Sequence, residues 1–485
     1  MVKEEKMKSL LLLLSLLFMF GCTDNNENIS IKVKYPTFDK VFKDSAEQMT
    51  VTTVVEQFWN TSTNRASMQL ESKTTSFTDG NLKLPTISEL DAEKVQIIME
   101  LKESDNIIAR GISSVIDISD PEKDYTVFIT PLDKFVELTT SELNPAKLDG
   151  LIGATSTVLP NGKVLIWGGM INNTPVSSVY VYSPDTATIK SLNFSTVARA
   201  YHAATIYYNN SEKRTDARVL ITGGIGASGE YLKSAVIFNP KTETIENATD
   251  MPEGRAYHSA VTGESFTYII GGKNESNYIS SILTFNSYSK SFGEVASLEV
   301  PVANTSAAFI GNQQIIIAGG NDDNTVYGDI YSLSWSDGMK LVNTGRKITP
   351  RSKLKVLFDG TTLFYIAGYS EVSSGVLQTP LASIDKYDPI LGNSVSKNLA
   401  TNMSATGDVT ASFSVNNQVM VMGGEYNGSP SNRSDLINLK TGDKTPITMN
   451  KTRKGATSVL TKTGQVIIIG GEGSTSPIEI ISSSY

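Results

Sequence analysis

The only two histidines of this 485-residue chain occur in matching contexts, each three residues after an arginine. The first pair is Arg199 and His202, and the second is Arg255 and His258. Imidazole is a usual group for proton transfer and metal binding near neutral pH, and guanidinium binds carboxylates. Two such pairs in neighbouring units could hold a metal or a sugar. Because the pattern is duplicated, we favour a structural role in a repeat, and we keep all four residues as candidate binding residues.

No catalytic residue is predicted elsewhere. The sequence lacks the Gly-x-Ser-x-Gly, phosphate-loop and His-Glu-x-x-His patterns. Asp322 and Asp323 could bind Ca²⁺, but two adjacent carboxylates in a loop are usually only hydrated. Cys22 is the single cysteine, so no disulfide is expected. We therefore expect no metal, no cofactor and no enzymatic activity.

A repeated strand ending positions these residues. Seven hydrophobic runs end in a glycine pair, or once in Ala-Gly, and they recur about every 50 residues. The pairs are Gly168-Gly169, Gly223-Gly224, Gly271-Gly272, Gly319-Gly320, Ala367-Gly368, Gly423-Gly424 and Gly470-Gly471. This period is typical of a β-propeller built from four-stranded blades. A small-residue strand before each apolar run suits the crowded axis, and the apolar run suits burial between blades.

The two ends of the repeat region complement each other. Only one strand fits after the last glycine pair, so the last blade lacks its fourth strand. Residues 135–140 (FVELTT) form an extra strand before the first blade and supply the missing one. Closure removes exposed sheet edges. We therefore predict a seven-bladed propeller over residues 132–485.

The repeats resemble kelch motifs, in which an Arg, a His and a small residue begin the innermost strand. Arg199-Ala200-Tyr201-His202-Ala203 and Arg255-Ala256-Tyr257-His258-Ser259 fit this pattern, while Ile189, Ile245 and Phe292 replace the expected outer tryptophan. The resemblance extends to galactose oxidase, but the Tyr–Cys crosslink of that copper site cannot form here. It also implies an alternative function, a sugar mutarotase- or epimerase-like enzyme with the Arg and His pairs at the channel mouth, although six blades are the rule in such mutarotases.

Binding is the function that the loops favour. The loops between the second and third strands are long and polar, and loops on a rigid ring commonly recognise partners. They contain five tyrosines, which provide amphipathic contact area at a low entropic cost. We take these as candidate binding residues for a protein or glycan: Tyr231, Tyr278, Tyr327, Tyr369 and Tyr426.

The N-terminus reads as an export signal. Lysines at positions 3, 6 and 8 precede a short apolar run that ends at Gly21-Cys22. This arrangement resembles the lipobox of bacterial lipoproteins, which implies cleavage after residue 21 and lipidation (palmitate-type acylation) of Cys22. Residues 22–30 would then be a lipidated tether to the membrane. We expect a lipid-anchored protein of the bacterial cell envelope in the outer membrane, facing the periplasm or the cell surface, because Thr23 rather than an aspartate follows the cysteine.

Residues 31–131 show short alternating or β-branched runs, which predict an immunoglobulin-like β-sandwich. Ser104-Asp105 is a good hairpin turn between two of these runs. The complete fold prediction is all-β, with this sandwich preceding a seven-bladed kelch-type propeller. The net charge is −8 and no basic cluster occurs, so nucleic acid is not an expected partner.

Overall fold

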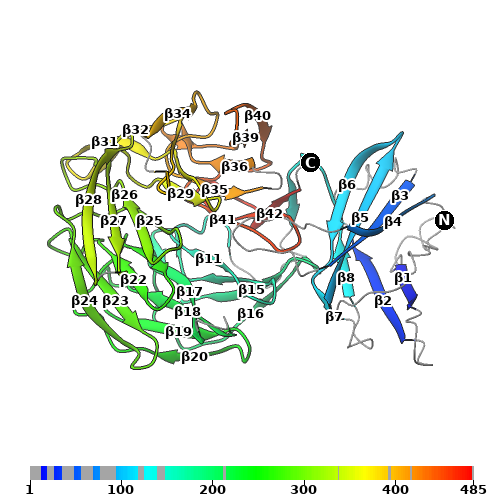
Figure 1. Cartoon of the computed structure of the whole chain (residues 1–485), viewed down its shortest axis with the longest axis horizontal. Helices are drawn as coiled ribbons and strands as arrows, with labels where there is room; N and C mark the ends of the chain where they lie inside the picture. Colours follow the sequence, from blue (N-terminus) through cyan, green and yellow to red (C-terminus); the bar gives the residue numbers. More distant parts are fainter. Residues whose placement is uncertain are drawn as a thin grey trace.

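The computed structural model describes four separate strands before residue 77 and then residues 94–117, 125–138 and 148–482, apart from 211–214, 337, 392–394 and 415–417. All regular elements within these residues are β-strands (Figure 1). No helix in this described part is long and apolar enough to cross a membrane. Cys22, the expected lipidation site, lies outside the described residues.

The N-terminal region contains two sheets. One has the order β1 (Leu12–Phe18), β2 (Glu27–Lys34) and β8 (Tyr125–Phe128), and β2 pairs with β8 in parallel. The other has the order β4 (Gln69–Ser76), β3 (Gln48–Val55), β5 (Lys94–Glu103), β6 (Asn106–Ile112) and β9 (Thr130–Pro131), with β7 (Ile116–Asp117) paired to β5. The predicted turn at Ser104-Asp105 is confirmed: both residues have positive φ, and the flanking β5 and β6 pair.

The rest of the described chain forms seven four-stranded antiparallel sheets, numbered here I to VII by their innermost strands. Sheet I consists of β11 (Thr155–Val158), β12 (Val164–Trp167), β15 (Val179–Ser183) and β16 (Thr188–Ser191). Sheet II consists of β17 (Ala203–Asn210), β18 (Thr215–Thr222), β19 (Ala235–Asn239) and β20 (Thr244–Asn247). Sheet III consists of β21 (Ser259–Thr262), β22 (Thr267–Ile270), β23 (Ser281–Asn286) and β24 (Ser291–Ser297). Sheets IV and V consist of β25 (Ser306–Phe309), β26 (Gln314–Ala318), β27 (Asp329–Ser334) and β28 (Lys340–Lys347); and β29 (Lys355–Phe358), β30 (Leu363–Ile366), β33 (Ile384–Tyr387) and β34 (Ser396–Ala400).

Sheets VI and VII complete the set. They consist of β35 (Val409–Phe413), β36 (Gln418–Gly423), β39 (Arg433–Asn438) and β40 (Lys444–Thr448); and β41 (Thr457–Leu460), β42 (Val466–Ile469), β43 (Ile478–Ile481) and β10 (Val136–Leu138). Small hairpins lie between the second and third strands of sheets I, V and VI: β13 (Met170–Ile171) with β14 (Thr174–Pro175), β31 (Tyr369–Ser373) with β32 (Val376–Pro380), and β37 (Glu425–Tyr426) with β38 (Ser429–Pro430).

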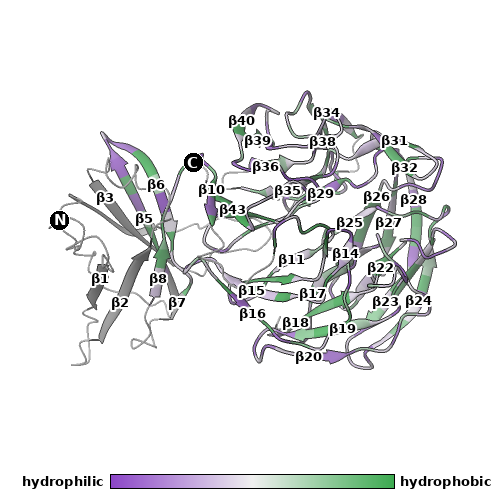
Figure 2. Ribbon diagram, turned by 180° about the vertical axis from the view of Figure 1, so that it is seen from behind, coloured by the Kyte–Doolittle hydropathy of each residue, from purple (hydrophilic) through white to green (hydrophobic). Residues whose placement is uncertain are grey.

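Burial within each sheet follows the strand order. The second strands β12, β22, β30 and β42 are buried at every position, whereas the innermost strands β11 and β21 are only partly buried. The outermost strand β20 is mostly exposed, and it is largely hydrophilic in Figure 2. The continuously apolar second strand is therefore covered on both faces by neighbouring sheets, as its sequence predicts.

The seven innermost strands contact one another in a closed cycle, from β11 through β17, β21, β25, β29, β35 and β41 back to β11. Side-chain hydroxyls join several neighbours, for example Ser156 with Thr457 at 2.6 Å and Thr410 with Ser458 at 2.7 Å. The strand expected at residues 135–140 corresponds to β10, which pairs antiparallel with β43. Sheet VII thus combines the two ends of the repeat region.

The glycine corners leave each second strand with positive φ. At Gly223 φ is 60°, and a Cβ atom would lie 2.2 Å from the carbonyl oxygen of Arg255. Any side chain there would collide with the next repeat, so the corner requires glycine both for its dihedral angles and for the close approach.

Candidate binding site at the mouth of the strand ring

The loop that leads into each innermost strand contains a residue in the left-handed backbone region. These seven residues, here called the mouth ring, are Gly153, Tyr201, Tyr257, Asn304, Lys353, Gly407 and Gly455. The four non-glycine members have φ angles between 53° and 57°. Such a conformation costs a non-glycine residue roughly 1–2 kcal/mol. Side chains kept in place at this cost are typical of functional sites.

Backbone hydrogen bonds connect successive members of the mouth ring. The amide of Tyr201 donates to the carbonyl of Gly153 at 2.8 Å, and that of Tyr257 donates to Tyr201 at 3.0 Å. The amide of Asn304 donates to Tyr257 at 2.9 Å, and that of Lys353 donates to Asn304 at 3.3 Å. The backbones of these four residues are therefore held next to one another across sheets II to V.

The first part of the site is aromatic. The rings of Tyr201 and Tyr257 lie with their centroids 4.6 Å apart. The ammonium group of Lys273 lies 5.7 Å from the ring centroids of both Tyr257 and Tyr278, a cation–π distance. The hydroxyl of Tyr278 donates to Oδ1 of Asp323 at 2.9 Å. This half of the mouth therefore presents flat rings with fixed orientations.

The second part is charged. Nζ of Lys353 lies 2.8 Å from Oδ2 of Asp408. Burial alone would raise the pKa of Asp408, but Lys353, Lys355 and Lys454 outweigh it and lower that pKa. Burial would lower the pKa of Lys353, and Asp408 reverses this and raises it. Both groups are consequently charged near neutral pH, and Lys454 forms a further ion pair with Glu425.

The third part is an amide and hydroxyl network between sheets IV and V. Nδ2 of Asn304 donates to Oδ1 of Asn321 at 2.9 Å, and Oγ of Ser352 donates to the same oxygen at 2.6 Å. These bonds fix the amide of Asn304. Together the tyrosine rings, the Lys353–Asp408 ion pair and the Asn304 amide can offer one ligand ring contacts, charge and hydrogen bonds. Such a combination of groups is typical of a binding site.

The four arginine and histidine candidates lie behind this surface. Arg199 and Arg255 are fully buried, and His202 and His258 are 6% and 7% exposed. Nη1 of Arg199 donates to the carbonyl of Gly223 at 2.8 Å, and Nη2 donates to Oγ of Ser234 at 3.0 Å. Arg255 makes the matching bonds to Gly271 and Ser281. Each arginine thus ties a glycine corner to the start of the third strand of its own sheet.

The histidines connect neighbouring sheets instead. Nε2 of His202 is 2.9 Å from the hydroxyl of Thr155 in sheet I, and Nε2 of His258 is 2.8 Å from that of Thr222 in sheet II. Burial, reinforced by Arg255, lowers the pKa of His258 to about 3, and burial also places the pKa of His202 well below its usual range. Both rings are neutral and enclosed, so a ligand at the mouth does not reach them in this structure.

The five candidate tyrosines are distributed unevenly. Tyr278 belongs to the aromatic part of the mouth, and the hydroxyl of Tyr327 donates to Oδ2 of Asp322 at 2.7 Å. Tyr231 is partly buried, and its backbone amide donates to Glu275. Tyr369 is only 3% exposed, so it lies within the structure rather than on the loop surface. Tyr426 is 48% exposed, with the guanidinium of Arg433 3.5 Å from its ring centroid.

Sequence reasoning did not select the mouth residues Tyr201, Tyr257, Lys353 and Asp408. A signal was present, because Tyr201 and Tyr257 stand two residues after the repeat arginine, and Lys353 stands likewise to Arg351. The carboxylate of Asp322 is occupied by the amides of Asn324 and Thr325 and by the hydroxyl of Tyr327. Among the described residues, no group of three or more His, Cys, Asp or Glu side chains is placed to hold a metal ion.

Comparison with known proteins identifies the repeats. Residues 153–368 match the family model of the KLHDC2/KLHL20/DRC7 Kelch-repeats domain. Residues 153–368 therefore contain kelch repeats, which are a repeat type of β-propellers. Among solved structures it is similar to the one titled "Structure of YjhT", with 14% sequence identity, coverage of 60% of this chain and 96% of that chain, and a TM-score of 0.44. No curated protein matches the sequence.

Proposed function

We propose that this protein is a lipid-anchored component of the bacterial cell envelope whose kelch propeller binds a protein or a glycan at the mouth ring. The observation that carries the binding function is the set of four side chains kept in the left-handed backbone region: Tyr201, Tyr257, Asn304 and Lys353. A purely structural ring could use glycine at all seven positions without strain. The adjacent rings of Tyr201 and Tyr257 and the Lys353–Asp408 ion pair could recognise one ligand together.

Substitutions by glycine test the binding function. Tyr201→Gly and Tyr257→Gly remove the contact between the two rings and relieve backbone strain, so binding should be lost while stability changes by less than about 1 kcal/mol. Lys290→Gly is the matched control, because Lys290 also has positive φ (52°) but lies in a turn of sheet III away from the mouth. The measurement is a glycan-array and protein-binding screen of the full chain, followed by titration of each variant. Equal affinity of the wild type and both tyrosine variants for every ligand found would refute the mouth as the site.

The anchor is proposed from the sequence alone. Cleavage after residue 21 would remove β1 and leave β2 paired with β8, and acylated Cys22 with residues 22–30 would connect the body to the outer membrane. Metabolic labelling with radioactive palmitate should label the wild type and leave the Cys22→Ala variant unlabelled. Label on the variant contradicts the proposal.

We further propose that sheets I to VII are the blades of one closed seven-bladed propeller and that the N-terminal sheets form an immunoglobulin-like sandwich. The cycle of innermost strands and the β10–β43 pair support closure. A density map with six or eight blades would overturn it. The alternative function, a sugar mutarotase- or epimerase-like enzyme, gains no support from the buried Arg199, His202, Arg255 and His258, and we propose neither catalysis nor nucleic-acid binding.

A further inference from the structure

A cavity opens at the end of the strand ring opposite the mouth, where the first and second strands of each sheet connect. Its volume is about 1170 Å³, which is above the usual range of roughly 300–1,000 Å³ for small-molecule pockets. The N-terminal region contributes Gln96 and Val115 to its wall. The cavity therefore lies between two parts of the chain, a common location for ligand sites.

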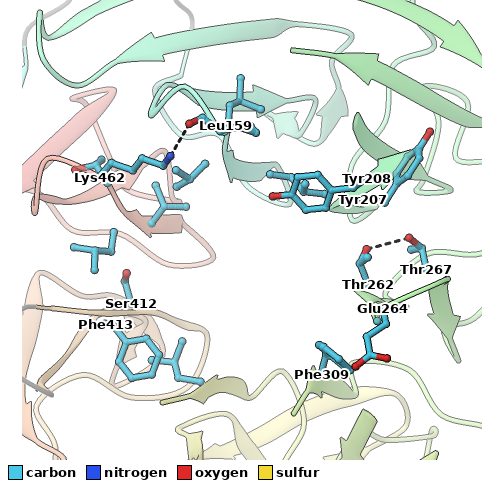
Figure 3. A pocket seen from close by; sticks show the side chains of 18 of the residues that line it. Leu159, Tyr207, Tyr208, Thr262, Glu264, Thr267, Phe309, Ser412, Phe413 and Lys462 are labelled. Atoms are coloured by element: carbon cyan, nitrogen blue, oxygen red, sulfur yellow. Dashed lines mark hydrogen bonds between the residues drawn. The ribbon is translucent and has the colours of Figure 1, made fainter. Parts of the chain in front are cut away.

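The wall of this cavity combines apolar and polar surface, and the side chains of its innermost strands supply much of the apolar part. Side chains from several innermost strands line it, including Val158, Ile206, Phe309, Leu357 and Phe413. Figure 3 shows Phe309, Phe413 and Tyr207 around the open space. The ring of Phe309 is backed by Trp335, with centroids 6.1 Å apart, so this aromatic wall is held in place.

Charge is confined to the rim. Among the described lining residues only Glu264 and Lys462 have acidic or basic side chains, and both lie in turns between first and second strands. Nζ of Lys462 is turned to the carbonyl oxygen of Pro160, 2.5 Å away. A charged group in the interior would lose its hydration without gaining a partner. The mouth, in contrast, contains Lys353, Lys355 and Asp408, so the two ends of the ring favour different ligands.

We propose that this cavity is a second binding site, which takes an uncharged small molecule with both apolar and polar groups. Apolar surface exposed to water costs about 25 cal/mol per Å², and a ligand of this class removes that cost. The hydroxyl of Ser412 in the wall allows a polar group on the ligand. This site is independent of the mouth ring and of the binding function proposed there.

The test uses the full chain in detergent and the uncharged fluorophore N-phenyl-1-naphthylamine. We expect saturable energy transfer from tryptophan to the probe, because Trp335 stands directly behind the cavity wall. Ala411→Phe fills the cavity from β35 and should raise the dissociation constant at least about tenfold. Ala227→Phe is the matched control: the same substitution at an exposed position in the second-to-third-strand loop of sheet II should leave binding unchanged.

Two results would overturn the proposal. One is the absence of saturable transfer in the wild type, and the other is unchanged affinity in a folded Ala411→Phe protein. Should that variant fail to fold, Leu357→Gln makes the same wall polar with little change in volume and should also weaken binding. Unchanged affinity in folded Leu357→Gln would count equally against the site.

Discussion

Four arginines occupy the same position in sheets II, III, V and VII, yet their partners differ. Arg351 and Arg453 meet buried carboxylates, Asp385 at 3.3 Å and Glu479 at 3.0 Å. Arg199 and Arg255 instead rely mainly on backbone carbonyls and serine hydroxyls, and burial lowers their pKa to about 10. They remain charged at neutral pH. A repeat arginine is therefore a structural clamp that tolerates more than one set of acceptors.

The histidines give the first prediction, a loss of stability in mild acid. The folded-state pKa of His258 is about 3, below the unfolded value of about 6.5, so the unfolded chain binds the extra proton between these values. The contribution of His258 to the free energy of unfolding is complete above about pH 6.5. It falls by about 1.4 kcal/mol per pH unit as the pH decreases towards 3. Chemical denaturation at pH 7 and pH 5 measures this slope.

The control for that prediction is His202→Gln/His258→Gln, which removes both histidines of the chain. The double variant should be less stable at pH 7, because two links between sheets are lost, but its stability should depend less on pH between 7 and 5. An equal pH dependence in the wild type and the double variant would contradict the prediction.

At the scale of the strands, the closing strand β10 is short but well buried. Leu138 is 1% exposed and packs in the core cluster that sheets I and VII share, with Val164, Ile467 and Ile478 among its members. Leu138→Ala should lower the free energy of unfolding by about 2–5 kcal/mol, because it leaves a cavity in this cluster. Hydrogen exchange of the β43 amides should accelerate at the same time, since β10 covers that edge.

Leu391→Ala is the matched control for the closing strand. Leu391 is 70% exposed in the turn after β33, so its loss should change stability by less than about 0.5 kcal/mol. If Leu138→Ala is as mild as this control and β43 exchange is unaffected, β10 does not hold the ring together.

The strands were the most predictable level of this molecule. Glycine corners and the apolar second strands are local patterns, and they locate the four-stranded sheets from sequence alone. Tyr201, Lys353 and Asp408 belong to different repeats, and only the packing of the innermost strands brings them to one mouth. The opposite cavity was equally inaccessible, because its wall combines side chains from most of the sheets with Gln96 from the N-terminal region.

At the scale of the whole molecule, the N-terminal region lies beside sheet VII (Figure 1), and Phe128 packs in the core cluster that includes Leu138 and Ile480. Leu132 forms a parallel bridge with Ser482, and the hydroxyls of Thr130 and Ser482 are 2.7 Å apart. Nε2 of Gln96 donates to the carbonyl of Lys462 at 3.3 Å. Gln96 and Lys462 both line the cavity, so the position of the N-terminal region determines part of its wall.

Gln465 connects the two regions at the centre of this interface, and it gives the last prediction. The side chain is 1% exposed, and Nε2 donates to the carbonyl of Phe128 at 3.3 Å. Gln465→Ala leaves buried acceptors without a donor, which costs about 1–3 kcal/mol. Because the cost falls on the interface, hydrogen exchange should accelerate in β8 and β9 while β22 and β30 stay protected. Gln378→Ala, on the exposed strand β32, should change neither. Uniform acceleration across all sheets would instead mean that Gln465 supports the propeller as a whole, and the two regions would then have to unfold as one unit.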